Sequence, residues 1–310
     1  MKVYSFDIYD TCVSRDCGIP QNVIKIVADI LFPDSTISLK KEFVRQRRNA
    51  EVKAMKALNK ESVTIKEIYE YVDFSLFPQI SKLDAVSKEI SIDLDSLTPI
   101  AKTLSIIECC RKRGKVLFIS DMYLPHDALH KRLKQIGVIK DDEKLYVSCE
   151  YNLTKKTGSL FKYVSERENI RFKNWVHYGD DDNNDIKQPS KLGIKCRKVS
   201  YDFNDLEKDW MGYTSVSGNH SFSIFSGISR SQRLLEGRKN KYNIITDIVG
   251  PIFISTAYYL IEKARKDNIR NIFYASRDPW LIYKVADILC KAKNDIENKY
   301  INISTKTIYQ

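Results

Sequence analysis

Glycine and proline are scarce in this chain of 310 residues, which contains only 11 glycines and 8 prolines. This scarcity excludes collagen-like repeats and long linkers rich in the two residues. Long apolar runs are lacking too: the nearest, residues 248–261, contains Pro251 and is too short to cross a bilayer. We therefore expect a buried helix there, and a globular protein without a membrane span.

Paired cysteines are also lacking. The seven cysteines are odd in number, follow no regular spacing and form no CxxC motif. This pattern argues against a disulfide framework and a structural zinc site, and fits a reducing compartment. The N-terminal segment MKVYSFDIYD contains Asp7 and Asp10, which the apolar region of a secretory signal peptide would not carry. We therefore predict a cytoplasmic protein.

Acidic residues are fewer than basic ones, 40 against 51, and the formal net charge is +11. A basic surplus suits nucleic acid, an anionic membrane or anionic small substrates. The surplus here is scattered and is densest over residues 40–60, where a solvated helix face explains it. The aromatic RNP pattern of RNA-binding sheets is absent. We expect no nucleic-acid partner, and nucleic-acid binding stays an alternative supported by charge alone.

Apolar strands alternate with helical patterns in the first 200 residues. Strands are expected at 3–6, 116–119, 145–147, 175–178 and 195–199, with helices at 100–113, 127–136, 160–167 and around 190. This order predicts an α/β fold, a Rossmann-like parallel sheet in three layers with right-handed crossovers. Residues from about 15 to 97 are helical and too long for one crossover, so they predict an inserted cap.

Two segments follow this core with its cap, which is expected to end near residue 200. Residues 201–242 are polar and irregular and are predicted to be a linker. Residues 243–310 begin again with an apolar helix, a strand over Asn271–Ala275 and a helix from Pro279. This pattern predicts a partial second α/β unit.

Polar side chains follow four of the predicted strands, at the edge where open α/β sheets bind ligands. In chain order they are Asp7-Ile8-Tyr9-Asp10-Thr11, Ser120-Asp121, Lys155-Lys156-Thr157-Gly158 and residues 179–185, GDDDNND. A carboxylate at a strand end can serve as nucleophile and as metal ligand, and a carboxylate cluster suits Mg²⁺. A serine hydroxyl and a lysine ammonium can hold phosphoryl oxygens. The order of these groups therefore indicates phosphoryl chemistry.

The segments SFDIYDT, FISDMYLP, KKTGSLF and HYGDDDNND resemble the four motifs of the haloacid dehalogenase (HAD) superfamily of phosphatases and related hydrolases. They are similar to a bacterial branch, often found beside capsule and surface-glycan glycosyltransferases, whose first two motifs read FDxFDT and SDMYLP. The resemblance covers residues 1 to about 200, with the helical insertion as cap. Weaker similarity reaches residue 280, where FYASRDPW has Pro279 in place of the glycine of an RDG motif.

The resemblance implies a role for each matching residue. Asp7 would be the nucleophile that forms an aspartyl-phosphate, and Ser120 would bind the phosphoryl oxygens. Lys156 is favoured over Lys155 as the neutralising cation because it stands directly before Thr-Gly. The implied Mg²⁺ ligands are Asp7, the backbone carbonyl of Tyr9, Asp180, and either Asp181 or Asp185. The remaining substrate- or phosphate-binding candidates are Tyr9, Asp10, Thr11, Asp121 and, on the cap, Arg48, although a surface pair with Glu51 explains Arg48 equally well.

One position departs from the family phosphatases, which carry a second aspartate two residues after the nucleophile as general acid–base. Tyr9 stands there, as an aromatic residue does in haloacid dehalogenases proper, which need no Mg²⁺ cluster. General acid–base help contributes about 10²–10⁴-fold to the rate, and proton transfer from Asp10 or water would have to replace it. His177 is expected to pack at its strand end rather than bind metal.

The resemblance implies a Mg²⁺-dependent phosphatase for a small phosphorylated metabolite, such as a capsule or surface-glycan precursor, with glycosyltransferases of that pathway as partners. The alternative is a catalytically weak, phosphate-binding scaffold module of a glycan-assembly system. Tyr9 and the incomplete second unit favour that alternative.

Overall fold

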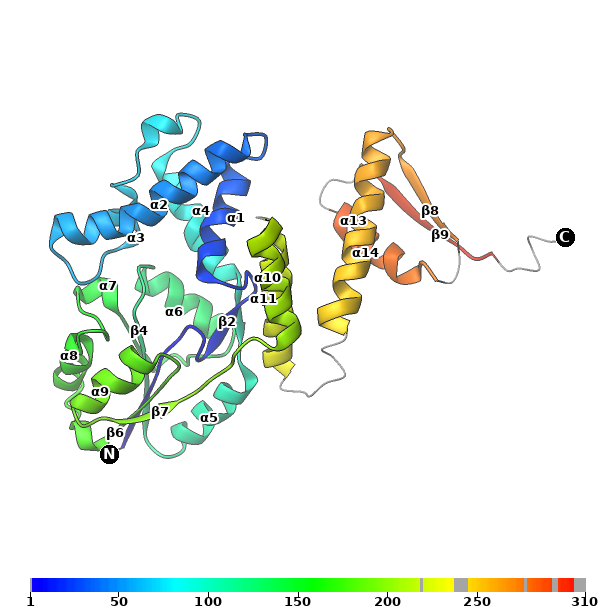
Figure 1. Ribbon diagram of the computed structural model, residues 1–310. Helices are drawn as coiled ribbons and strands as arrows, with labels where there is room; N and C mark the ends of the chain where they lie inside the picture. The colour runs from blue at the N-terminus through cyan, green and yellow to red at the C-terminus, as the bar shows by residue number, and fades with distance from the viewer. Residues whose placement is uncertain (1, 218–219, 237–244, 276–277, 292–294, 304–310) are drawn as a thin grey trace. The chain divides into compact units, whose positions relative to one another are not determined.

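The computed structural model describes residues 2–217, 220–236, 245–275, 278–291 and 295–303. It divides into two compact units, Met1–Arg238 and Lys239–Gln310 (Figure 1). The first unit carries all four motifs. Among the described residues, no helix combines the length and hydropathy that crossing a membrane requires.

A five-stranded parallel sheet forms the centre of the first unit, as the alternating pattern predicts. Its spatial order is β5-β4-β1-β6-β7, and every neighbouring pair is parallel. The strands are β1 (Val3–Phe6), β4 (Lys115–Ser120), β5 (Lys144–Val147), β6 (Trp175–Gly179) and β7 (Lys195–Lys198). The chain builds one side of the sheet from β1 and then returns to build the other. Such a reversal places a crevice at the carboxyl end of β1, where ligands bind in open α/β sheets.

Both faces of this sheet are covered, so the unit has three layers. Because side chains alternate along a strand, Tyr4 and Phe6 enter one apolar cluster and Val3 enters another. The first cluster includes side chains of α5 (Ala101–Arg111) and α6 (His126–Gln135), and the second those of α8 (Ser159–Arg167). Short elements complete the layers: α7 (Ser148–Tyr151), η2 (Phe172–Asn174), η3 (Asp182–Lys187) and α9 (Gln188–Lys191).

A helical insertion lies between β2 (Val13–Arg15) and β3 (Leu97–Pro99), which pair with each other antiparallel. Its helices are α1 (Pro20–Leu31), α2 (Ile37–Leu58), α3 (Ile65–Tyr69) and α4 (Lys82–Asp95), with the turn η1 (Phe74–Leu76). Three buried rings, Phe32, Phe43 and Phe77, pack with centroids 5.3–5.5 Å apart in the insertion and belong to the same apolar cluster as Phe6 and Phe118 of the sheet. The chain enters and leaves the cap through the paired strands β2 and β3, which we call the hinge.

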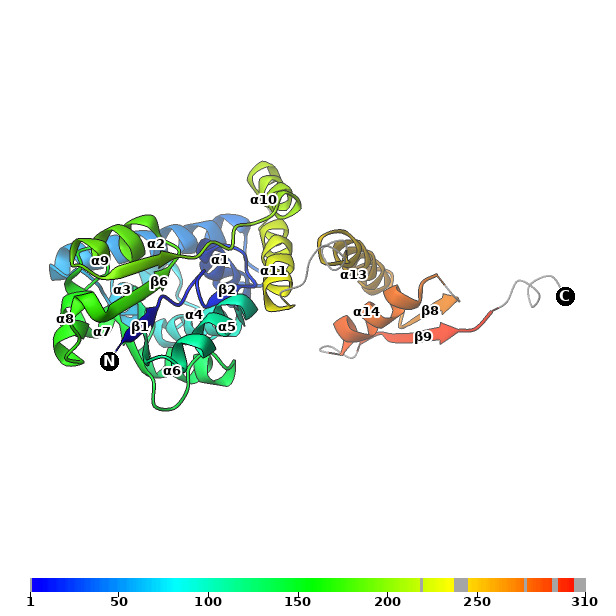
Figure 2. The same cartoon turned by 90° about the horizontal axis from the view of Figure 1, so that it is seen from below.

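The segment predicted to be a linker is helical instead. Residues 205–217 form α10 (Asp205–Ser217), and α11 (Ser221–Glu236) packs against it and against β2, β3 and α5. Figures 1 and 2 both place α11 beside β2. The prediction was wrong because the buried face of α11 consists largely of serines, at 223, 226, 229 and 231. Such a face shows no apolar stripe in the sequence. Residues 237–242 lie outside the described part of the chain.

The second unit contains a parallel β-α-β arrangement, in agreement with the predicted partial α/β unit. Strands β8 (Asn271–Ala275) and β9 (Glu297–Ile301) pair in parallel. The helical elements are η4 (Ile245–Val249), α13 (Gly250–Lys266) and α14 (Trp280–Cys290). Ala257, Ile261, Tyr274 and Ala286 are among its buried side chains. Residues 276–277 of the FYASRDPW segment lie outside the described residues.

Candidate active site

Asp7 is the first residue beyond β1 and lies at the carboxyl edge of the sheet. Its backbone N–H donates to the carbonyl of Tyr178 on β6 at 2.9 Å, which continues the ladder one residue past the end of β1. This bond brings the Asp7 carboxylate beside the acidic loop that follows β6. Only 6% of the residue is exposed, so the carboxylate has little water to stabilise its charge.

The lysine that meets Asp7 is Lys155, not Lys156. The Lys155 ammonium contacts Asp7 and lies 2.6 Å from Oδ1 of Asp185, and its side chain is buried. Lys156 is exposed. The loop is held by Asp121, whose carboxylate accepts the backbone N–H of Lys155 at 2.9 and 3.1 Å. The sequence-based choice of Lys156 therefore needs correction, because the anchored backbone turns Lys155 inward and its neighbour outward.

Three carboxylates converge opposite this lysine. Ligand oxygens of Asp7, Asp180 and Asp185 all lie within 4.8 Å of one another. With one ammonium among them, two negative charges stay uncompensated. An all-oxygen set with that charge fits a divalent, oxygen-seeking cation such as Mg²⁺.

The sequence left open whether Asp181 or Asp185 joins Asp7 and Asp180 as an acidic ligand. Of the two, Asp185 is the one whose carboxylate lies beside them. The Asp181 side chain is exposed and caps the following turn instead, accepting the backbone N–H groups of Asn183 and Asn184 at 2.8 and 2.6 Å. A metal contact from the Tyr9 carbonyl stays a prediction.

A chain of buried hydrogen bonds orients Asp185. The indole Nε1 of Trp175 donates to Oγ of Ser5 at 2.7 Å, and that hydroxyl lies 2.6 Å from Nδ1 of His177. Because the serine already accepts one bond, it can donate to Nδ1, which assigns the His177 proton to Nε2. Nε2 then donates to Asp185 Oδ1 at 3.1 Å. The sequence predicted only that His177 packs at its strand end. In the structure, His177 also orients Asp185 through this hydrogen bond.

Gly179 leaves the space that Asp185 occupies. A Cβ atom on Gly179 would lie 2.3 Å from Cγ of Asp185, far inside van der Waals contact. Sequence reasoning missed both Gly179 and the role of His177. The HYGD segment contains the two residues, but only the fold of the loop brings Asp185 back onto them.

Burial and neighbouring charges set the protonation of the site. Burial raises the pKa of Asp7 well above its usual value, against the opposing effect of the Lys155 charge. Burial, followed by the charge of Asp10, raises the pKa of Asp180 to about 6. Burial would also raise the pKa of Asp185, but Lys155 and His177 hold it well below the usual range. Burial lowers the pKa of His177, which keeps the imidazole neutral. The pKa values of Asp7 and Asp180 are thus raised by burial first and by neighbouring carboxylates second, and a bound cation would favour the ionised forms of both groups.

The hydroxyl residues of the motifs lie close to the same edge. Ser120 ends β4 and is buried, one strand away from Asp7. Thr11 donates its hydroxyl to Oδ1 of Asp180 at 3.0 Å, and its own carbonyl accepts the Thr103 hydroxyl at 2.6 Å. Thr11 therefore supports Asp180 directly, and Asp121 acts on the loop of Lys155. Their predicted contact with phosphate stays a prediction.

The Tyr9 side chain points into the base of the cap. The Arg15 guanidinium stacks on its ring with Cζ 3.8 Å from the centroid and pairs with Asp93 at 3.0 Å. The Tyr9 hydroxyl is buried and has no hydrogen-bond partner among the described residues. Burial, followed by the charge of Asp93, raises the pKa of Tyr9 well above its usual value. Tyr9 cannot therefore act as a base near neutral pH.

The cap arginine that faces inward is Arg47. It is fully buried, donates to both carboxylate oxygens of Glu89 at 2.8 and 2.6 Å, and shares Glu89 with the Tyr69 hydroxyl. Arg48 is exposed, and Arg45 pairs with Glu42 on the surface. Because one helical residue turns about 100°, burying Arg47 directs Arg48 away. Glu89 on α4 therefore selects Arg47 as the arginine buried in the cap, and the predicted contact of Arg48 with substrate stays a prediction.

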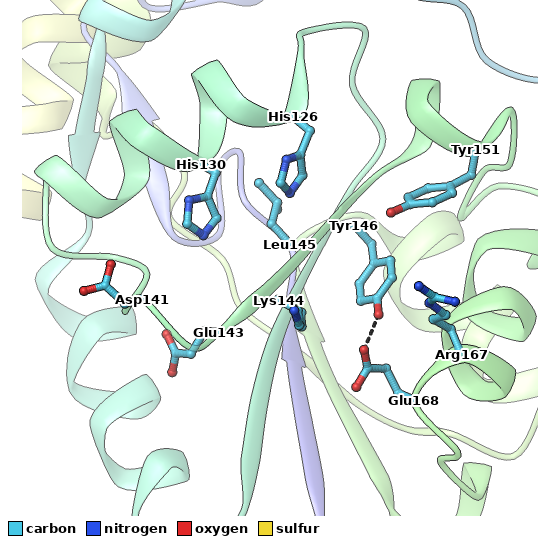
Figure 3. Close-up of a pocket in the computed structure, with 10 residues that line it drawn as sticks. All are labelled: His126, His130, Asp141, Glu143, Lys144, Leu145, Tyr146, Tyr151, Arg167 and Glu168. Atoms are coloured by element: carbon cyan, nitrogen blue, oxygen red, sulfur yellow. Dashed lines mark hydrogen bonds between the residues drawn. The ribbon is translucent and has the colours of Figure 1, made fainter.

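A separate cavity lies at the edge strand β5. Figure 3 shows this space of about 330 Å³, in which His126 and His130 stand one turn apart on α6. The Tyr146 hydroxyl donates to Glu168 on its other side. The other lining residues are Asp141, Glu143, Lys144, Leu145, Tyr151 and Arg167. None of the acids that converge at Asp7 lines this cavity, so it is distinct from the candidate active site.

Comparison with known proteins finds HAD-type hydrolases among solved structures. No family model and no curated protein sequence matches the chain. The magnesium-bound HAD-hydrolase YfnB of Bacillus subtilis is 18% identical with a TM-score of 0.46, over 66% of this chain and 90% of that one. A HAD family enzyme of Bacteroides thetaiotaomicron, in complex with magnesium and inorganic phosphate, is 18% identical with a TM-score of 0.44, over 64% and 94%. A 2-haloacid dehalogenase of Pseudomonas syringae is 13% identical with a TM-score of 0.47, over 65% and 86%.

Proposed function

We propose that the chain is a Mg²⁺-dependent phosphatase of the HAD superfamily that works through an aspartyl-phosphate. The observation that carries this proposal is the convergence of Asp7, Asp180 and Asp185 around the single buried ammonium of Lys155. A dry site with two uncompensated negative charges is suited to a divalent cation and a phosphoryl group together. Mg²⁺ would neutralise phosphoryl charge when held by these acids and the Tyr9 carbonyl.

In this proposal, Asp7, Lys155 and Ser120 each have a separate role in the reaction. One oxygen of Asp7 is held by Lys155, which leaves Oδ2 to attack phosphorus as the ester oxygen departs. Ser120 donates to a phosphoryl oxygen, and Lys155 offsets charge on the nucleophile and on the phosphoryl group. Water then attacks the phosphorus of the aspartyl-phosphate, which releases inorganic phosphate and restores Asp7.

The leaving group must take its proton without a second aspartate. Tyr9 is too weak an acid to serve, and Asp10 is paired with Arg230 at 2.7 Å. Solvent water is the proton source in this proposal. An ester whose leaving oxygen needs little protonation is turned over fastest, because general-acid help of about 10²–10⁴-fold is missing.

The substrate is proposed to be a small phosphorylated metabolite. By resemblance of the FDIYDT and SDMYLP segments, it would be a cytoplasmic precursor of capsule or surface glycan, with glycosyltransferases of that pathway as partners. The alternative is a phosphate-binding scaffold of a glycan-assembly system with weak turnover. Tyr9 supports this alternative, because it stands at the sequence position of the usual acid–base and is too weak an acid to replace it.

The deciding experiment is phosphate release over a panel of sugar phosphates, polyol phosphates and phosphorylated amino alcohols, with and without Mg²⁺. We expect release that requires Mg²⁺ and falls by more than about 100-fold in Asp7→Asn, because the nucleophile and a cation ligand are lost together. Circular dichroism confirms that the variant is folded.

The other outcomes identify the alternatives. Phosphate binding without turnover would favour the scaffold. Turnover by Asp7→Asn within about tenfold of wild type would rule out Asp7 as the nucleophile. Hydrolysis that survives EDTA, with halide release from 2-haloacids, would point to metal-free dehalogenase chemistry.

A further inference from the structure

Helix α11 lies outside all four motifs, yet one of its arginines contacts the loop that carries Asp7. The Arg230 guanidinium is buried, with Nη1 2.7 Å from Oδ1 of Asp10. Nε of the same group donates to the carbonyl of Tyr201 at 2.8 Å, and the ring centroid of Phe203 lies 4.5 Å from Cζ. These contacts fix the guanidinium independently of Asp10. A fixed, buried cation is suited to hold a carboxylate in one place.

Asp10 is the residue of that loop whose position most needs such support. Its φ is 55°, in the left-handed region that is unfavourable for residues other than glycine. Its charge reaches Asp180, since it is among the causes that raise the pKa of that group. Thr11, the next residue, hydrogen-bonds Asp180 at 3.0 Å. Without a partner, the Asp10 carboxylate would be free to turn toward the three converging acids.

The same helix also crosses the hinge of the cap. A Cβ atom on Gly227 would lie 2.1 Å from the backbone nitrogen of Gly18, so the backbone of α11 passes very close to the backbone at Gly18. The Ser14 hydroxyl of β2 donates to Ser231 at 2.9 Å. These contacts lie on the same helix as Arg230 and hold it against the hinge. The contacts of Gly227 and Ser231, on either side of Arg230 along α11, therefore help to hold Arg230 beside Asp10.

We propose that Arg230 is a positioning residue of the active site, which keeps the Asp10 carboxylate away from the cation position so that Asp7, Asp180 and Asp185 supply the acidic ligands. This inference rests on the proposed function, since it takes those three acids as cation ligands. It makes the α10–α11 hairpin part of the hydrolase unit. Loss of the guanidinium frees a fourth carboxylate, which attracts Mg²⁺ but competes with the phosphoryl oxygens for it.

The test compares Arg230→Met with Arg233→Met in the full chain, with p-nitrophenyl phosphate as the probe ester. Arg233 lies one turn later on α11 and pairs with Glu207, which makes it a matched control. We expect Arg230→Met to lower kcat about tenfold while the Kd for Mg²⁺, measured by calorimetry without substrate, decreases. Arg230→Lys keeps the charge and should recover most of kcat. Arg233→Met should change both quantities by less than about twofold.

A double-mutant cycle with Asp10→Asn identifies the mechanism. In that background the carboxylate to be held is gone, so adding Arg230→Met should change kcat by less than about twofold. An equal loss in both backgrounds would overturn the inference, because Arg230 would then be a general structural residue. Unchanged or weaker Mg²⁺ binding by Arg230→Met would also overturn it. If Arg230→Met does not fold, the cycle is run with Arg230→Gln, which keeps a polar side chain and removes the charge that holds Asp10.

The outcomes separate this inference from the proposed function. A wild type that hydrolyses the probe with Mg²⁺, while Arg230→Met behaves like Arg233→Met, contradicts the inference alone. A wild type that binds Mg²⁺ but releases no phosphate contradicts the proposed function. In that case a decrease in the Mg²⁺ Kd of Arg230→Met that Asp10→Asn abolishes supports the positioning role, and an unchanged or higher Kd overturns it. A wild type that binds no Mg²⁺ overturns both.

Discussion

Lys155 is the residue on which the charge balance of the candidate site depends. Its ammonium contacts two of the three converging carboxylates, and their charges raise its pKa above the usual value although burial would lower it. The neighbouring Lys156 is exposed and has no part in this balance. The two lysines therefore offer a matched pair for testing the site.

Lys155→Met should abolish most phosphate release, because it removes the cation that offsets charge at Asp7. It should also lower the stability of the metal-free protein by roughly 3–5 kcal/mol, since it leaves buried carboxylates unpaired. Steady-state kinetics and urea denaturation measure the two effects. Lys156→Met is the control and should change neither the rate nor the midpoint; a large effect there would restore the sequence-based choice.

The raised pKa of Asp180 predicts how the stability of the metal-free protein varies with pH. Its pKa of about 6 in the folded protein exceeds the value of about 3.9 expected in an unfolded chain. The folded state therefore binds more protons, and ionisation of Asp180 lowers the free energy of unfolding as the pH rises from about 4 to about 6. We expect this pH dependence to be weaker in Asp180→Asn, measured by denaturation in EDTA. Saturating Mg²⁺ should remove it in wild type; an unchanged slope in the variant would contradict the assignment.

The helices of the cap are joined by buried ion pairs as well as by aromatic packing. Arg47 on α2 reaches Glu89 on α4, and both side chains are fully buried. Arg15, at the hinge strand β2, reaches Asp93 one turn further along α4. Helix α4 thus connects the cap to the hinge through two carboxylates on one face, spaced four residues apart.

Arg47→Met should destabilise the protein by about 3–5 kcal/mol, because it leaves the Glu89 carboxylate buried without its cation. Arg45→Met, on the exposed side of the same helix, should leave the free energy of unfolding unchanged within the error of the measurement, as expected for a surface pair. Equilibrium urea denaturation compares the two. Replacing both members of the buried pair, Arg47→Met with Glu89→Leu, should recover part of the loss.

At the scale of the molecule, the boundary of the first unit lies after α11 rather than before α10. The compact first unit extends to Arg238, and Tyr201 and Leu234 share a small apolar cluster with Ile100 of the core. The unit therefore includes the hairpin that follows the last motif by about twenty residues of sequence.

A chain of residues 1–238 should fold and keep Mg²⁺ binding, whereas a chain of residues 1–200 should aggregate or bind Mg²⁺ more weakly. The shorter chain exposes the surfaces of β2, β3 and α5 that α11 covers and loses the partner of Asp10. Size-exclusion chromatography and calorimetry compare the two. Equal folding and equal Mg²⁺ affinity of both chains would show that the hairpin is dispensable.

The second unit has an apolar core of its own, and several of its large apolar side chains are exposed. Phe273, Trp280 and Ile288 are exposed to 57%, 47% and 66%. The predicted helix, strand and second helix correspond to α13, β8 and α14, and β9 adds a parallel strand that the sequence analysis did not predict.

The sequence by itself determined the parallel sheet, because four apolar strands alternate with amphipathic helices and each ends in a polar motif. It also determined that Asp7, Ser120 and the acids after β6 share one edge, since the carboxyl ends of parallel strands must lie together. These features depend on local periodicity and on topology rules that any such pattern obeys.

Only the tertiary structure decided between neighbours. The buried members of the candidate pairs are Lys155, Asp185 and Arg47. Asp121 binds the backbone of Lys155, and Glu89 pairs with Arg47. His177 contacts Asp185 in the space that Gly179 leaves. The α10–α11 hairpin was missed for the same reason, because its serine-rich face is recognised as buried only when Gly18 and Ser14 lie against it. Side chains of neighbouring residues on a helix point about 100° apart. The local sequence does not contain the position of the partner that decides which of two neighbouring side chains is buried.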